Sequence, residues 1–155
     1  MIYKKTEYHN MKTLKYSEFL NESFDATAHN GNDLGNYFIR LLAVRDQAHV
    51  FHWQTKSFAR HEAFGNFYES FLTNVDALVE MIMGLKGRPI FGEGATISIN
   101  DYSDVNISRF FENLEPIFST ELEYICSSDE HEELFDQARI IIADIDKLKY
   151  LLTLS

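Results

Sequence analysis

The stretch that decides the fold is FGNFYESFLTNVDALVEMIMGL, residues Phe64–Leu85. Its apolar residues recur at spacings of three and four, which is the period of one face of an α-helix. This face consists of Phe64, Phe67, Phe71, Val75, Leu78, Ile82 and Leu85. The glycines at Gly84–Gly87 and the following Pro89 predict where the helix ends. The stretch therefore predicts a long helix with one buried side.

Three further segments show the same period. One precedes the decisive stretch, from about Asp33 to Lys56, with Asn32 or Asp33 as its cap and a short joint at Ser57–Ala59. Its apolar stripe consists of Tyr37, Leu41, Val44, Ala48 and Phe51. The third segment carries Ile107, Phe110, Phe111, Leu114, Ile117, Phe118, Leu122 and Ile125, and the last carries Leu134, Ala138, Ile141, Ile145, Leu148 and Leu152. All four segments predict amphipathic helices.

Two features refine the later helices. Pro116 lies inside the third segment and predicts a kink or a restart there. The acidic run SSDEHEE before the last segment suits the start of a helix, because carboxylates stabilise a helix N-terminus. The connection GRPIFGEGATISINDYSDVN is too long for a tight turn and could cross the length of a bundle. We therefore expect an all-α, ferritin-like four-helix bundle with one long crossover between its second and third helices.

Composition limits the function classes. The 155 residues fit a single globular domain, here residues 32–155, preceded by a polar tail at residues 1–31 with a short helix around Tyr16–Phe24. The net charge of −10 argues against broad nucleic-acid binding, so we expect DNA binding to be weak or absent despite the lysines of the tail. A lone Cys126 fits a reducing compartment. The sequence contains no run of about 18 apolar residues, which a membrane span would need. The expected location is the cytoplasm.

Four side chains are candidate metal ligands. His52 lies near the end of the first predicted helix and His61 lies at the start of the second. Asp76 and Glu80 are four residues apart, so both carboxylates project from one side of the second helix. Imidazole nitrogens and carboxylate oxygens together suit iron, with zinc or manganese as possible substitutes.

The distances along the helix decide how these ligands can combine. Fifteen residues separate His61 from Asp76, which is about 22 Å along a straight helix. A metal–ligand bond is only about 2 Å long, so one ion cannot reach both groups in one chain. If the first two helices form an antiparallel hairpin, His52 comes alongside His61. Two chains related by a two-fold axis would then bring the histidines of one chain to the carboxylates of the other.

Other interpretations of these residues remain open. An intramolecular di-iron bundle would need Glu-x-x-His on two helices, and only DQAH at Asp46–His49 approaches this motif. His49 is more often a solvent-facing histidine than a ligand, and Trp53 most often packs in a core or an interface. Asp76 and Glu80 could form an ordinary solvated face, although unpaired carboxylates beside an apolar stripe are costly to desolvate.

The run HVFHWQTKSFARHEAFGNFYESFLTNVDALVEMIMGLKGRPI resembles the miniferritins of the Dps family. His52-Trp53, His61-Glu62, Asp76 and Glu80 match the family's pattern residue by residue, and the similarity covers residues 33–91. The resemblance implies a hollow homo-oligomeric shell, a dodecamer, with metal sites at two-fold interfaces. It also implies ferroxidase activity, an oxidoreductase reaction in which Fe(II) is oxidised with hydrogen peroxide and stored as ferric mineral. His52, His61, Asp76 and Glu80 would be the catalytic metal ligands, with His49, Trp53 and Glu62 close by.

One departure from the family weighs against catalysis. Gly65 stands where the family usually has an acidic ligand, one turn after the second histidine. The alternative function is therefore a ferritin-like cage or dimer whose metal sites are structural or degenerate and lack ferroxidase activity. A third possibility is a helical interaction module without metal, in which the histidines only pack.

Overall fold

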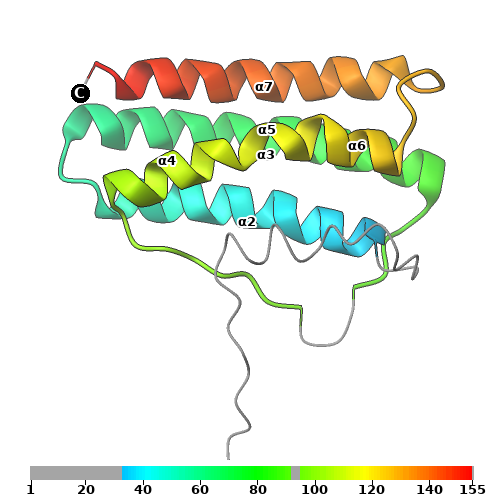
Figure 1. Cartoon of the computed structure of the whole chain (residues 1–155), viewed down its shortest axis with the longest axis horizontal. Helices are drawn as coiled ribbons and strands as arrows, with labels where there is room; N and C mark the ends of the chain where they lie inside the picture. The colour runs from blue at the N-terminus through cyan, green and yellow to red at the C-terminus, as the bar shows by residue number, and fades with distance from the viewer. Residues whose placement is uncertain (1–32, 92–94, 155) are drawn as a thin grey trace, which may run out of the picture.

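The computed structural model describes residues 33–91 and 95–154 (Figure 1). Its helices are α2 (Asp33–Gln54), α3 (Phe58–Lys86), α4 (Asp104–Glu112), α5 (Leu114–Phe118), α6 (Thr120–Ile125) and α7 (Glu132–Leu152). No strand occurs within these two ranges. The prediction of an all-helical bundle is therefore confirmed. The predicted helix at Tyr16–Phe24, the lysines of the tail and the cap residue Asn32 lie outside the described residues.

The helices form four rods, because α4, α5 and α6 follow one another along a single broken rod (Figure 1). α2 and α7 run in one direction, while α3 and the broken rod run in the other (Figure 1). α3 packs against both α2 and α7, so it lies at the centre of the contacts that hold the bundle together. This central position explains why α3 has the clearest apolar stripe of the sequence.

The connection between α3 and α4 returns along the outside of α2 (Figure 1). The Gln47 side chain of α2 donates a hydrogen bond to the carbonyl oxygen of Asn100 at 2.8 Å and accepts one from the Asn100 backbone N–H, also at 2.8 Å. Gln47 is almost fully buried, so these two bonds satisfy a polar group that would otherwise be costly to bury. The connection is thus bonded to the bundle rather than lying loosely over it.

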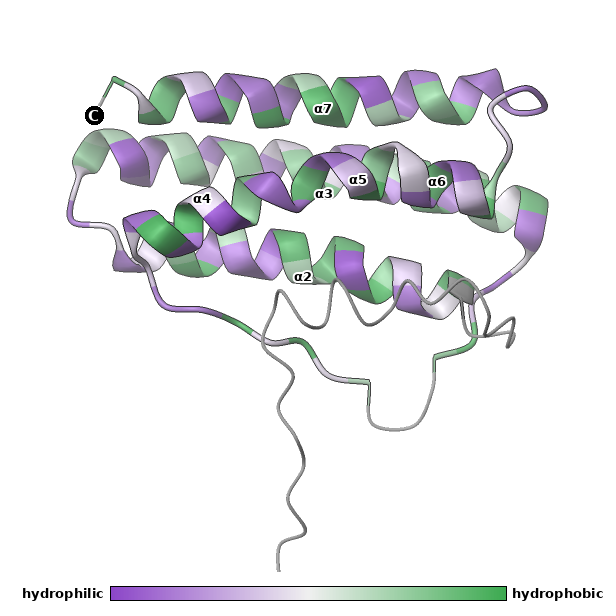
Figure 2. Cartoon of the chain, in the orientation of Figure 1, coloured by the Kyte–Doolittle hydropathy of each residue, from purple (hydrophilic) through white to green (hydrophobic). Residues whose placement is uncertain are grey.

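Most residues of the predicted stripes are buried, while Phe111, Ile125 and Leu152 are only partly buried. The core contains Tyr37, Leu41, Val44, Ala48, Phe51, Phe64, Phe67, Phe71, Val75, Leu78, Ile82, Ile107, Phe110, Leu114, Ile117, Phe118, Leu122, Leu134, Ala138, Ile141, Ile145 and Leu148. Leu85 was predicted to belong to the α3 stripe but is 45% exposed, because the stripe ends one turn earlier at Ile82. Figure 2 shows apolar and polar residues alternating along each helix, as expected when one side is buried.

The broken rod restarts where Pro116 predicts it. α4 ends at Glu112, and Pro116 is the third residue of α5. A proline is tolerated in the first turn of a helix, because the N–H that it lacks would have no acceptor within the helix there. The break therefore places Pro116 at a helix start instead of inside a continuous helix.

A buried ion pair joins α2 to α6. The Nη2 atom of Arg40 lies 2.6 Å from Oε2 of Glu121, and the two side chains are only 5% and 8% exposed. Nearby, the Tyr37 hydroxyl donates a hydrogen bond to the Ile117 carbonyl oxygen at 3.2 Å, and burial raises the pKa of Tyr37 well above its usual value. These polar contacts fix α2 against the broken rod at one register, since sliding either helix would leave a charge unpaired in the core.

None of the helices in residues 33–91 and 95–154 is long and apolar enough to cross a membrane.

Candidate functional site

The candidate site begins at the joint between α2 and α3. α2 ends at Gln54 and α3 begins at Phe58, so only three residues reverse the chain. Ser57 caps α3, and its hydroxyl oxygen accepts a hydrogen bond from the Arg60 backbone N–H at 3.3 Å. Capping of this kind satisfies one of the free N–H groups at a helix start. The short, capped joint makes an antiparallel hairpin and sets the last turn of α2 beside the first turn of α3.

This hairpin brings His52 and His61 together. Their rings are stacked with centroids 3.7 Å apart and an angle of 23° between the planes. The Nδ1 atom of His52 lies 2.8 Å from the carbonyl oxygen of His61, and Nδ1 of His61 lies 3.0 Å from the carbonyl oxygen of His52. The predicted pairing of the two imidazoles is confirmed.

The reciprocal hydrogen bonds assign the protons on both rings. A carbonyl oxygen can only accept, so each Nδ1 must carry the hydrogen that it donates. In a neutral imidazole the other nitrogen, Nε2, then has a free lone pair. Metal-binding histidines commonly have this arrangement, in which one ring nitrogen donates to a backbone carbonyl and the other faces the ion. In the neutral form of each ring, the backbone carbonyls of the same chain thus select the tautomer that binds metals through Nε2.

Aromatic side chains surround the pair on one side. The ring of His49 stacks on Tyr68 with centroids 4.2 Å apart, and the indole of Trp53 is 4.3 Å from His49. Tyr68 also meets the ring of His52 edge-on, at 5.4 Å. His49 is only partly exposed and contacts both of these aromatic rings. Trp53 is not part of the core of its own chain, since 66% of it is exposed.

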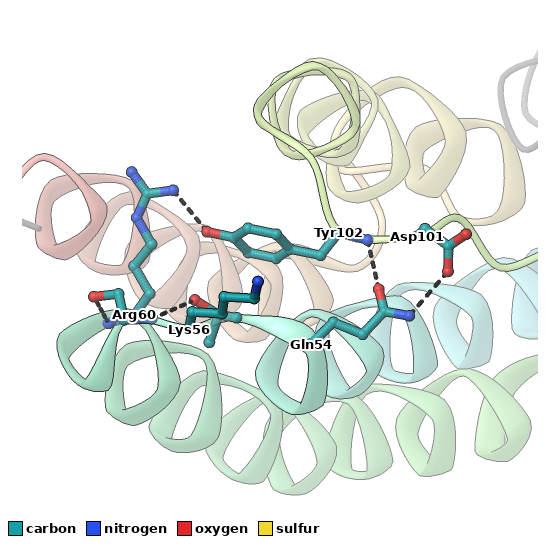
Figure 3. Close-up of a pocket in the computed structure, with 7 residues that line it drawn as sticks. Gln54, Lys56, Arg60, Asp101 and Tyr102 are labelled. Carbon is teal, nitrogen blue, oxygen red and sulfur yellow. Dashed lines mark hydrogen bonds between the residues drawn. The ribbon is translucent and has the colours of Figure 1, made fainter.

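A clamp of polar residues holds the connection between α3 and α4 against the joint between α2 and α3, around an open hollow of about 590 Å³ (Figure 3). The amide nitrogen of Gln54 donates to Asp101 at 2.9 Å, and the amide oxygen accepts from the Tyr102 backbone N–H. Arg60 on α3 donates to the Tyr102 hydroxyl at 2.7 Å (Figure 3). The same segment thus bonds to the end of α2 and to the start of α3. This clamp fixes the two helix ends that carry the histidine pair.

The predicted carboxylate ligands lie elsewhere on α3. Asp76 and Glu80 are both exposed, and neither forms an ion pair or a side-chain hydrogen bond with the described residues. α3 is continuous over these positions, so Asp76 is about 22 Å and Glu80 about 28 Å along the helix from His61. Glu62 is exposed beside His61. The structure therefore brings the two histidines together but leaves the carboxylates far from them.

Residues 33–91 and 95–154 contain no group of three or more His, Cys, Asp or Glu side chains close enough to hold one metal ion. Two histidine nitrogens would be half of a typical four-ligand set. Asp76 and Glu80 are the candidate oxygen ligands, and neither has an ion-pair partner among residues 33–91 and 95–154. The donors present thus fit a metal ion only if a second chain supplies the missing half.

Tyr68 and Gly65 have roles near the site that the sequence did not predict. Tyr68 was not among the predicted site residues, yet it contacts both His49 and His52. Its position seven residues after His61, two helical turns along the same side, could have indicated the contact. The sequence singled out Gly65 because the Dps family usually has an acidic residue there, whereas the structure shows that the His52 ring lies in the space beside it. A built Cβ at Gly65 would lie 3.1 Å from Cε1 of His52.

The fold and the site together define an all-helical bundle with a backbone-bonded histidine pair at one end. The chain belongs to a family of unknown function, DUF5856, which matches residues 52–152. The matched residues contain the histidine pair and both candidate carboxylates. No curated protein and no solved structure matches the chain.

Proposed function

We propose that this protein is an iron-binding ferroxidase and iron-storage protein of the Dps type, with a ferritin-like fold. Fe(II) would be the substrate, oxidised at sites between two chains, and the ferric product would be kept inside a hollow cytoplasmic oligomer. The observation that carries this proposal is the His52–His61 pair, whose hydrogen bonds leave both Nε2 atoms free to bind. Asp76 and Glu80 of a second chain would complete the site.

The surface around the histidines supports pairing with a second copy. Trp53 and Leu42 are exposed on the side of α2 that carries His49, and Leu72 is exposed on α3 one turn after Tyr68. Large exposed apolar side chains near one another are typical of protein interfaces. A two-fold interface uses the same surface of both chains, so it would place two complete sites symmetrically. A dodecameric shell built from such pairs is the assembly that the Dps resemblance implies.

The reaction would use hydrogen peroxide as its oxidant and the residues of two chains as iron ligands. Two Fe(II) ions each give one electron to hydrogen peroxide, which takes up two protons and leaves as two water molecules, while the iron remains as Fe(III). His52 and His61 would bind Fe(II) through neutral nitrogens, and the two carboxylates would balance the growing positive charge. Glu80 would bridge toward a second iron. Burial of these carboxylates at an interface becomes favourable when the cation neutralises them.

Two measurements test the proposal. Light scattering after size exclusion should give a mass of at least two 18.1 kDa chains. Anaerobic Fe(II) titration followed by peroxide should give ferric absorbance faster than the same iron without protein. A monomer in solution would reject the inter-chain site, and oxidation no faster than that of free iron would reject catalysis.

The alternative function is a cage or dimer in which the same residues hold a structural metal, with no ferroxidase activity. Gly65 favours this alternative, because it removes a carboxylate that the Dps family usually places beside the histidines. The alternative predicts an oligomer that binds iron or zinc tightly but does not accelerate the reaction with peroxide. The two measurements above therefore separate the two functions.

A further inference from the structure

Gly65 lies on α3 one turn after His61, and the ring of His52 occupies the space beside it. A built Cβ at this position would lie 3.1 Å from Cε1 and 3.2 Å from Nδ1 of His52. Carbon atoms in ordinary contact are about 3.5–4.0 Å apart, so the His52 ring would have to move by a few tenths of an ångström. Nδ1 is the atom that donates to the His61 carbonyl oxygen. A side chain at Gly65 would therefore press directly on one of the two hydrogen bonds that hold the pair.

The backbone gives no other reason for a glycine here. Gly65 is the eighth residue of the 29-residue helix α3, and among the described glycines only Gly87, after the helix end, has a positive φ. Glycine inside a helix is less stable than alanine, because it loses more conformational freedom on folding. Gly84, near the other end of the same helix, provides a comparison, since a Cβ atom placed there would meet nothing within 4 Å. What distinguishes Gly65 is its contact with His52.

We propose that Gly65 is a positioning residue for the histidine pair. The missing side chain lets His52 lie close against α3, where its Nδ1 reaches the His61 carbonyl and its ring stacks on that of His61. An acidic residue at this position would supply a carboxylate but would occupy the place of the ring. This chain therefore has two closely paired imidazoles, whereas an acidic residue at position 65 would add a carboxylate but hold the imidazoles less closely. The inference rests on the proposed function in treating the pair as metal ligands.

The test compares Gly65→Ala with Gly84→Ala as a matched control on the same helix. In the metal-free wild type, nitrogen–proton NMR should show two slowly exchanging imidazole Nδ1–H groups, from His52 and His61. Gly65→Ala should lose or broaden the His52 signal, and its affinity for Zn²⁺ should fall about 10–100-fold, as is typical when a group that orients a ligand is lost. Gly84→Ala should keep both signals and the Zn²⁺ affinity. An unchanged His52 signal and affinity in Gly65→Ala would overturn the inference.

A second comparison separates the contact from general effects on the fold. In a His52→Ala background the obstruction is gone, so adding Gly65→Ala should raise the melting temperature by about 1–3 °C, as Gly84→Ala should in the wild type. A fall in melting temperature in that background would also overturn the inference, since the obstruction would then not be His52. If the wild type binds no Zn²⁺ but the NMR changes occur, the positioning role is supported while the proposed function fails.

Discussion

Replacing Arg40 with Met should lower the free energy of unfolding by about 3–5 kcal/mol at neutral pH, the usual cost of leaving one charge of a buried pair without its partner. Arg40 lies 2.6 Å from Glu121 in the core, and neither side chain has appreciable access to water. Met fills a similar volume, so the loss should come from the abandoned carboxylate more than from a cavity. Denaturant unfolding at matched chain concentration measures the effect.

The same variant should show a definite pH dependence. Burial raises the pKa of Glu121 above its ordinary value of 4.5, and the Arg40 guanidinium opposes that rise. Without Arg40 the pKa rises further, so the folded state binds a proton more readily than the unfolded state does. A raised pKa gives stability that is present below about pH 4.5 and is lost as the pH rises through the folded-state value. The deficit of Arg40→Met should therefore be larger near pH 8 than near pH 5.

A double variant provides the control for this pair. Arg40→Met with Glu121→Leu removes both charges and should recover most of the lost stability, because apolar residues of similar volume often replace a buried ion pair without loss. A double variant as unstable as Arg40→Met alone would contradict the assignment of the loss to the unpaired Glu121 carboxylate. A deficit in Arg40→Met that does not change with pH would contradict it as well.

The second large effect should follow from removal of a proposed ligand. His61→Ala or Glu80→Ala should reduce the Fe(II)–peroxide reaction to the rate of free iron and weaken metal binding by more than about 100-fold, beyond the effect typical of groups that only orient a ligand. Each change removes a donor atom, and neither residue is in the core, so the melting temperature should change little. Stopped-flow absorbance and calorimetry measure the two losses.

Glu112→Ala serves as the control for Glu80→Ala. Glu112 is an exposed acid at the end of α4, so its substitution removes the same charge from a helix surface outside the proposed site. It should leave the initial oxidation rate and the metal affinity unchanged. If Glu112→Ala slows oxidation as much as Glu80→Ala, the effect belongs to the total negative charge of the protein, and the carboxylates of α3 are not ligands.

Much of the fold could be predicted because periodicity reports which side of each helix is buried. The stripe of α3, the joint before it and the restart at Pro116 all follow from local spacing and from the properties of glycine and proline. The pairing of His52 with His61 was also predictable, since a three-residue joint leaves little choice other than an antiparallel hairpin. The proposed ligand roles of these residues, and of Asp76 and Glu80, stay predictions.

The remaining features depend on which residues of separate helices meet, and local spacing does not report this. Arg40 lies three residues after Tyr37 and four before Val44, so the sequence places a charge on the buried stripe of α2 without indicating its partner. Glu121 on α6 likewise lies three residues after Phe118, the last residue of α5. The opposite charges of Arg40 and Glu121, both on buried helix faces, could have predicted an ion pair. The role of Gly65 had no such signal, because it depends on where a side chain from another helix lies.

The central claim is that each metal site is shared by two chains, and subunit complementation tests it most directly. His61→Ala and Glu80→Ala chains would be unfolded together, refolded as a mixture and titrated with Zn²⁺. A mixed pair contains one intact site, formed by the histidines of one chain and the carboxylates of the other, so random mixing should restore about one quarter of the wild-type sites. No tight sites in the mixture, although mass spectrometry shows mixed oligomers, would contradict the claim.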